Sequence, residues 1–244
     1  MSAEARRSAV VFGARNLGRA VIENLAAEGW SVVGIARSEE TLAGVARAGA
    51  VPLAGDVTDR TSVREALEHA ASLHGRVELV VNAAAAYGGA RSGPFGGGPL
   101  SEASAEAFEP WAAAPARAAF TFLSTSAAFL RAQGGAATVI QVTGGSARRA
   151  MPGRGLWASG AAATRALTHA AAQEWRAEGI HVALLVVDAT IDSPKTEERL
   201  RGKPADESAA QEDVARAVAA LAAQTPRGYT HELVITPAGD RWVP

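Results

Sequence analysis

The chain has 244 residues, a length that one hydrophobic core can support, and its formal net charge is -1 with acidic and basic residues interleaved. This balance provides neither a basic stripe for a phosphate backbone nor an acidic tail, so nucleic acid is not an expected partner. The absence of cysteine excludes a disulfide framework and thiolate metal ligation, and it is compatible with a reducing compartment.

The first apolar run follows two arginines and meets Gly13 after only four residues. A secretion signal or a membrane span needs a longer run, so these residues are better explained as a buried strand. We therefore expect a cytoplasmic protein with no membrane segment. No repeat or linker interrupts the chain, and one domain over residues 1–244 is the expectation.

Short runs rich in β-branched residues alternate with longer helical patterns, the arrangement of βαβ units around a parallel sheet. The sequence thus predicts an α/β fold with a doubly wound parallel sheet of about seven strands in three layers, α/β/α. Strands are expected at 9–12, 31–36, 51–54, 77–81, 137–142, 182–187 and 232–235. Helices are expected at 19–28, 39–48, 61–74 with Thr61 as N-cap, 108–132, 158–177 and 213–223.

Two segments show no periodicity. Residues 86–101, rich in Gly and Pro, are expected to form a mobile loop at the carboxyl side of the sheet, where ligands bind in such folds. Residues 192–211 are polar and could cover a pocket. The two alanine-rich helices could form a subunit interface or simply pack tightly on the sheet.

The histidines provide no metal site. They are His69, His74, His169, His181 and His231, and their spacing matches no ligand pattern. We expect them to be solvated, and we expect no metal.

Gly13 directly follows the first predicted strand, and Gly18 opens the first helix. Glycine lets backbone amides approach a pyrophosphate, and the helix N-terminus supplies oriented donors. The second strand ends in Arg37-Ser38, with no acid before Glu39. Because an arginine there accommodates the 2′-phosphate of NADP, whereas a carboxylate binds the ribose of NAD, the sequence indicates NADP(H). The alternatives are an ordinary tight turn and a solvated arginine.

In their order and spacing, landmarks along nearly the whole chain resemble those of the short-chain dehydrogenase/reductase (SDR) family. Residues 13–18 resemble its TGxxxGxG turn, and 36–38 resemble the strand end of its NADP-preferring members. Further matches are Asp56-Val57-Thr58 (its adenine-contacting acidic motif), Val81-Asn82-Ala83-Ala84 (its NNAG segment), 139–145 (its serine strand), 156–167 (its YxxxK helix) and Ile191-Asp192-Ser193-Pro194 (its IDTP motif).

The resemblance implies a Rossmann-type fold, an oxidoreductase, an NADP(H) cofactor and an unidentified small-molecule substrate. It also implies a homodimer or homotetramer built through the two long helices. Together with the glycine turn, it assigns the cofactor to Gly13, Arg15, Asn16, Leu17, Gly18, Arg37, Ser38, Asp56, Val57, Asn82, Ala83 and Ser193.

The glycine turn departs from the family pattern. It is one residue shorter and lacks the middle glycine, which leaves Ala14, Arg15, Asn16 and Leu17 between the two glycines that remain. We expect pyrophosphate binding to persist with altered geometry.

All four catalytic residues of the family are replaced. In the family, a tyrosine exchanges the substrate proton, a lysine lowers the pKa of that tyrosine and holds the ribose, a serine positions the carbonyl, and an asparagine anchors a water relay. The aligned positions, in that order, hold Trp157, Ala161, Gly144 and Pro115. Loss of a positioned general acid forfeits roughly 100- to 10,000-fold in rate. Carbonyl reduction by the family route is therefore not expected.

A different alignment cannot restore the tyrosine and lysine. The only tyrosines are Tyr87 and Tyr229, and the only lysines are Lys195 and Lys203, so no YxxxK occurs in the chain. A tryptophan N–H donates a hydrogen bond but does not titrate in water.

Four residues are candidates for contact with a substrate: Tyr87, Thr143, Trp157 and Asp188. Tyr87 could reach the pocket or lie on the surface, and Thr143 could bind a carbonyl or satisfy local backbone groups. Asp188, near the place of the family's Pro-Gly, could act as a base. The alternative for Asp188 is a structural ion pair with Arg148, Arg149 or Arg154.

Three functional hypotheses remain open. The first is an NADP(H)-binding, SDR-like oxidoreductase in which unfamiliar residues act. The second is a cofactor-binding pseudoenzyme or regulatory partner subunit, and the third is a redox-neutral enzyme that reuses the pocket around Trp157. The sequence does not reveal the substrate.

Overall fold

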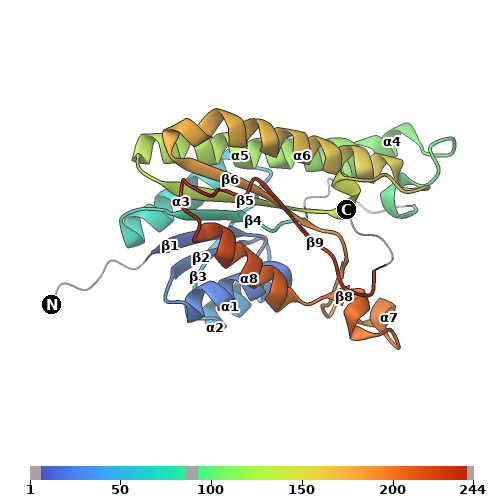
Figure 1. Ribbon diagram of the computed structural model, residues 1–244, viewed down its shortest axis with the longest axis horizontal. Coiled ribbons are helices and arrows are strands. Elements are labelled where there is room, and N and C mark those ends of the chain that lie inside the picture. The colour runs from blue at the N-terminus through green and yellow to red at the C-terminus, as the bar shows by residue number, and fades with distance from the viewer. Residues whose placement is uncertain (1–6, 86–92, 241–244) are drawn as a thin grey trace.

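The computed structural model describes residues 7–85 and 93–240, and it contains a seven-stranded sheet with helices on both faces (Figure 1). All neighbouring strands of this sheet are parallel, in the order β3-β2-β1-β4-β5-β6-β9. The predicted α/β fold, a doubly wound parallel sheet of Rossmann type, is confirmed. The strands are β1 (Ser8–Phe12), β2 (Ser31–Ala36), β3 (Val51–Ala54), β4 (Leu79–Asn82), β5 (Ala137–Gly144), β6 (Ile180–Val187) and β9 (Glu232–Ile235).

Helices cover the two faces in separate layers (Figure 1). One layer holds α1 (Leu17–Ala27), α2 (Glu39–Arg47) and α8 (Gln211–Ala222). The other layer holds α3 (Arg60–His74), α5 (Ala114–Gln133) and α6 (Gly155–Trp175). The two alanine-rich helices therefore lie side by side on one face of the sheet.

Alternate residues of the central strands belong to different cores. Ala9 and Val11 of β1 pack in the core beneath α1 and α8, whereas Val10 and Phe12 pack in the core beneath α3, α5 and α6. Because both faces are covered, the strands are apolar throughout rather than alternating, and all eight residues of β6 are buried. The continuous apolar runs in the sequence follow from this double burial.

The helix that the sequence predicts over 108–132 contains a π-helical turn near its start. It consists of α4 (Ala105–Phe108), a π-helical turn (Glu109–Ala113) and α5. Pro110 and Pro115 each stand at the beginning of one of these pieces, where the missing N–H costs least. The residues at the two junctions, Phe108, Glu109, Ala113 and Ala114, all have right-handed helical backbone angles, so the predicted long helix is confirmed, with its start at Ala105.

The N-cap predicted for α3 is also wrong. Asp59, rather than Thr61, caps the helix, and its carboxylate accepts hydrogen bonds from the N–H groups of Thr61 and Ser62. Asp and Thr are both good N-cap residues. Because Asp59 is the cap, the helix begins at Arg60, one residue before the predicted start.

The predicted loop 86–101 is described only from residue 93. A 3-10 turn (Phe95–Gly97) packs on the start of α6, where a Cβ on Gly97 would lie 2.6 Å from the Leu156 side chain. Gly98 also forms an isolated bridge with Arg154. Within the described residues of this loop, Gly97 and Gly98 thus lie against the start of α6.

The polar segment after β6 forms a small layer of its own. It contains β7 (Thr190–Ile191), α7 (Glu197–Leu200), a 3-10 turn (Ala205–Glu207) and β8 (Ser208–Ala209), and β7 pairs with β8. Two further 3-10 turns, Gly145–Ala147 and Arg176–Glu178, follow β5 and α6. In the described part of the chain, no helix meets the length and hydropathy needed to span a bilayer.

Candidate functional site

The strand order reverses between β1 and β4, which are neighbours in the sheet. In open α/β sheets, ligands bind outside the carboxyl ends of the strands at such a reversal. Here the two ends are joined by a hydrogen bond from the Ala83 N–H to the Phe12 carbonyl, at 2.9 Å. The predicted phosphate-binding turn follows β1 and so lies at this reversal.

Gly13 and Gly18 make that turn compact. Gly13 has a φ of 81°, and a Cβ added to it would lie 2.5 Å from the backbone of Ala84. A Cβ on Gly18 would overlap the Gly13 carbonyl oxygen. Both glycines are thus required by close backbone approach, and together they form a cradle that any side chain would fill.

The N–H groups of Asn16 and Leu17 open α1. Among the described residues, neither N–H donates to an intramolecular acceptor, and the Asn16 side chain does not cap the helix. The first turn of α1 carries no acidic residue. An anion at this helix end would meet free donors and the positive end of the helix dipole, so the turn fits a dinucleotide pyrophosphate.

Asn16 also provides the positive φ that the shortened turn needs. Its φ of 46° and ψ of -112° make it the only described residue other than glycine with a positive φ. These angles lie outside the left-handed helical region and favour glycine, so Asn16 is strained here. The shortened turn thus keeps a positive φ at a position that is not glycine.

Arg37 follows β2, and its side chain is 72% exposed. Its Nη1 lies 3.4 Å from Oδ2 of Asp56, which follows β3. Partial burial raises the pKa of Asp56, but hydrogen bonds from Thr58 and the charge of Arg37 lower it by more, so the pKa lies below its usual value. The pair brings together two of the predicted cofactor-binding residues.

The remaining predicted cofactor residues play different local parts. Ser38 is the N-cap of α2, and Val57 is buried in the core. Asn82, 2% exposed, donates to the Gln141 side chain at 3.0 Å and accepts from the Ala84 N–H at 3.1 Å. Ser193 is farther along the chain and lines a pocket of about 270 Å³ with Glu197 and Glu212.

The family's serine position is open rather than blocked. Gly144 ends β5, and the nearest heavy atom to a Cβ placed on it is the Val187 carbonyl oxygen, at 3.9 Å. The adjacent Thr143 is half-buried. A Cβ at position 144 would therefore fit, and steric conflict does not explain why the predicted serine position holds glycine.

The family's lysine position is closed. Ala161 is 3% exposed within α6. Its neighbour Gly160 approaches the π-helical turn so closely that a Cβ would lie 2.7 Å from the Ala112 carbonyl oxygen. A lysine at 161 would start from a buried position.

Trp157, at the family's tyrosine position, belongs to an aromatic cluster. Its ring centroid lies 5.7 Å from that of Phe95 and 6.1 Å from that of Trp111, and the Phe95 and Trp111 centroids are 5.0 Å apart. The Arg154 guanidinium lies 5.4 Å from the Phe95 centroid. The cluster joins three segments that are distant in sequence, and sequence periodicity gives no signal for it.

Asp188 pairs with Arg149. The guanidinium donates to both carboxylate oxygens, at 3.2 and 3.3 Å, and the Asp188 side chain is only 10% exposed. A Cβ on Gly145 would overlap the Asp188 carboxylate. The geometry matches a bidentate ion pair that joins the ends of β5 and β6.

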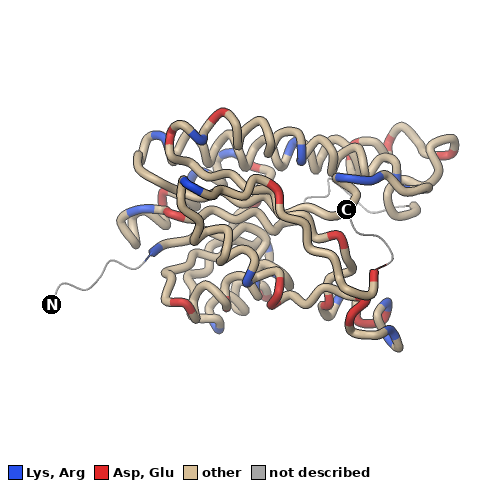
Figure 2. Tube along the Cα trace, viewed as in Figure 1, with Lys and Arg blue, Asp and Glu red and all other residues tan. Residues whose placement is uncertain are grey.

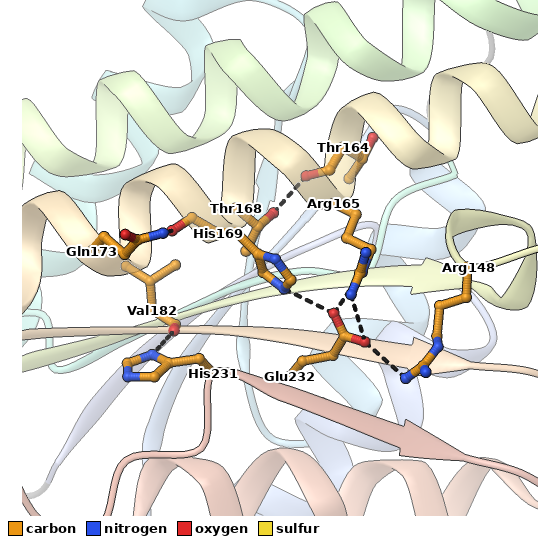
Figure 3. Close-up of polar contacts among 9 residues, drawn as sticks. All are labelled: Arg148, Thr164, Arg165, Thr168, His169, Gln173, Val182, His231 and Glu232. Carbon is orange, nitrogen blue, oxygen red and sulfur yellow. Dashed lines mark hydrogen bonds and ion pairs between the residues drawn. The ribbon is translucent and has the colours of Figure 1, made fainter. Parts of the chain in front are cut away.

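A second ionic cluster, centred on Glu232 of β9, lies close to this pair. Glu232 contacts Arg165 and His169 of α6 at 2.6 and 2.8 Å, and it contacts Arg148 after β5 at 2.9 Å (Figure 3). Burial raises the pKa of Glu232, but the hydrogen bond from Arg165 and electrostatic interactions with Arg165, His169 and Arg148 lower it by more. Sequence analysis missed this cluster because its members come from three separate segments.

The other site predictions have mixed outcomes. Tyr87 lies outside the described residues. Among the residues that the structure describes, no group of three His, Cys, Asp or Glu side chains could hold a metal ion. The expectation that all histidines are solvated is wrong, because His181 is 1% exposed within β6. Basic and acidic residues are interspersed over the molecule (Figure 2).

Comparison with known proteins agrees with this architecture. The family model for short chain dehydrogenase matches residues 7–202. No curated protein sequence matches the chain. Similar solved structures include ones with 20% and 24% sequence identity to this chain. Identities this low show a common fold and nothing more.

Three of these structures illustrate the likeness. A short chain oxidoreductase from Pseudomonas aeruginosa PAO1, NADPH-bound and described as containing an atypical catalytic center, has a TM-score of 0.81 at 20% identity and covers 97% of this chain and 98% of its own. An alcohol dehydrogenase from the archaeon Thermococcus sibiricus, complexed with 5-hydroxy-NADP, has a TM-score of 0.78 at 23% identity and covers 98% and 100%. A metagenomic short-chain oxidoreductase in complex with NADP has a TM-score of 0.73 at 22% identity, with the same coverage.

The glycine turn at the β1–β4 reversal, the seven-stranded parallel sheet and a family model that spans most of the sequence lead to one conclusion: the chain belongs to the short-chain dehydrogenase family of oxidoreductases.

Proposed function

We propose that this protein is an NADP(H)-binding oxidoreductase that reduces acceptors whose products take their proton from solvent. The observation that carries the proposal is the compact two-glycine turn with the free amides of Asn16 and Leu17 at the start of α1. These groups would hold the pyrophosphate. When bound, the reduced nicotinamide supplies a hydride.

Preference for NADP(H) over NAD(H) rests on Arg37. Its guanidinium is largely exposed, and its contact with Asp56 is long, at 3.4 Å. An arginine in this place at the end of β2 suits a 2′-phosphate. The NADPH, NADP and 5-hydroxy-NADP held by similar structures are consistent with this assignment.

The choice of acceptor rests on what the chain lacks. The Trp157 indole cannot transfer a proton, and Ala161 offers no charge that could tune another group. Asp188 is engaged by Arg149. Quinones and enones are activated acceptors, and the oxygen of the reduced product can be protonated by water. Simple aldehydes and ketones need an acid in place as the hydride arrives.

Nucleotide titrations test the cofactor assignment. We expect NADPH to bind more tightly than NADH, because the 2′-phosphate gains a charge-assisted contact of about 1.5–3 kcal/mol, or roughly tenfold or more in affinity. Arg37→Ala should remove this preference and leave NADH binding unchanged, whereas Arg47→Ala on α2 is the matched control. Equal affinities for the two nucleotides in the wild-type protein would refute the preference.

A turnover screen tests the acceptor class. NADPH oxidation, followed by absorbance, should be faster with quinones and enones than with aldehydes. Turnover of aldehydes at comparable rates would mean that a proton donor is present after all.

A second candidate function is a cofactor-binding protein without turnover. The packing of Trp157 in the aromatic cluster and the burial of Ala161 favour it, because both positions serve the packing of α6. Tight NADPH binding with no oxidation by any acceptor would support this candidate over the first.

A further inference from the structure

A further cavity lies at the amino ends of the strands, whereas the glycine turn lies at their carboxyl ends. Its volume is about 380 Å³, within the usual range for small-molecule pockets. It is formed where the chain enters β6 and β9, at the amino ends of these strands. Its lining residues are Arg176, Pro226, Arg227, Gly228, Tyr229 and His231.

The charge in this cavity is positive. Within residues 7–85 and 93–240, no carboxylate lies within ion-pair distance of Arg176 or Arg227. Two acids, Glu174 and Glu178, are each two residues from Arg176 in the sequence, but neither lines the cavity, and Glu178 is bound by Arg131 through two hydrogen bonds. Residues 223–231 contain no Asp or Glu. Two guanidinium groups therefore face the cavity without a neutralising partner.

Tyr229, one of the lining residues, packs against a buried histidine. The Tyr229 ring stacks on His181 with centroids 4.1 Å apart and an interplanar angle of 2°. His181 is 1% exposed, and its Nε2 lies 3.0 Å from the Thr230 carbonyl oxygen. Because a carbonyl only accepts, this nitrogen carries the proton. Burial lowers the pKa of His181, and Tyr229 stacks on this buried, hydrogen-bonded ring.

His231 presents a further polar group. Its Nδ1 lies 3.2 Å from the Val182 carbonyl oxygen and therefore donates to it (Figure 3). The Nε2 atom has no partner among the described residues and is available to a ligand. The lining residues thus include two arginines, a tyrosine and a histidine.

We propose that this cavity is a second binding site, separate from the dinucleotide crevice, for a small anion that carries a phosphoryl group. Two planar guanidinium groups can share the oxygens of one phosphate in bidentate contacts, which a chloride ion cannot offer. The positive lining disfavours cations, and the polar lining disfavours an apolar ligand. The tyrosine hydroxyl can donate a further hydrogen bond to a phosphate oxygen.

Titration with inorganic phosphate, in a phosphate-free buffer with ionic strength held constant by sodium chloride, tests the proposal. We expect saturable binding in calorimetry, with the NMR signals of the Tyr229 and His231 rings shifting along the same curve. Arg176→Ala and Arg227→Ala should each weaken binding by about tenfold, the loss of one charge-assisted contact. Tyr229→Phe keeps the stack on His181 and should weaken binding less.

Two controls locate the bound phosphate. Arg37→Ala changes the dinucleotide crevice and should leave phosphate binding intact. Arg201→Ala removes a surface arginine that belongs to neither site, and it should also leave phosphate binding intact. If Arg37→Ala abolishes binding while Arg176→Ala does not, the phosphate occupies the crevice and the proposal is wrong. Absence of saturation, or an equal response to chloride alone, would also overturn it.

Discussion

Gly145 is the residue on which the ion pair between β5 and β6 depends. Its missing Cβ leaves the space that the Asp188 carboxylate occupies opposite Arg149. Gly145→Ala should therefore lower the free energy of unfolding by about 1–3 kcal/mol through overpacking. Gly144→Ala, one position earlier, is the control, because its Cβ would meet nothing closer than 3.9 Å. Equal urea midpoints for the two variants would contradict this explanation.

Asn16 should respond to substitution in the opposite way from an ordinary helical asparagine. Its φ of 46° is strained for a side chain, so Asn16→Gly should keep or raise stability. Asn16→Val should lower it by about 1–3 kcal/mol, because a β-branched residue avoids this region. The contrast is Asn24→Gly inside α1, which should cost about 0.5–1 kcal/mol. Thermal unfolding of the three variants gives the comparison, and equal losses in Asn16→Gly and Asn24→Gly would disprove it.

Single residues also mark the limit of sequence reasoning about the site. The replacements predicted at positions 144, 157 and 161 depend only on the spacing of landmarks in the sequence, and they stay predictions. Their structural consequences could not be predicted from that spacing. Gly144 leaves open space and Ala161 is closed in by packing, and this difference depends on which segment lies opposite each residue.

At the level of elements, the contacts of Glu232 with Arg165, His169 and Arg148 connect the edge strand β9 to α6 and to the segment after β5. Its pKa lies below the ordinary value of 4.5. A carboxylate whose pKa is lower in the folded than in the unfolded chain stabilises the fold above the unfolded value, and this contribution is lost as the pH falls through the folded value.

We therefore expect the free energy of unfolding to decline as the pH drops below about 4.5. Glu232→Gln should be less stable than the wild type at neutral pH and should show a shallower decline in acid. Glu68→Gln, at an exposed position in α3, should leave the pH profile unchanged. Urea unfolding at a series of pH values measures both slopes, and parallel profiles for the wild type and Glu232→Gln would exclude this role.

Element boundaries were predictable where the pattern is local. The bounds of β2, β3 and β9 match the sequence prediction, because apolar runs end at glycine or polar residues there. The helix that contains Pro110 and Pro115 was predicted, but its π-helical turn was not, because the alanine-rich pattern continues through both prolines. His181 was misjudged because its neighbours in β6 determine its burial, and a single histidine in the sequence carries no such information.

At the level of the whole molecule, the alternation of strands and helices was enough to predict the three-layer fold, because parallel sheets require covered faces. The Trp157 cluster, the Glu232 cluster and the cavity at Arg176 were not predictable in this way. Each is assembled from segments that meet only in the folded chain.

The most direct test of the account is a crystal structure of the protein grown with NADPH. The account predicts a pyrophosphate on the Asn16 and Leu17 amides, a 2′-phosphate on Arg37 and no hydroxyl–ammonium pair beside the nicotinamide. A crevice that stays empty at saturating NADPH, or a tyrosine and a lysine positioned at the reactive ring, would contradict it.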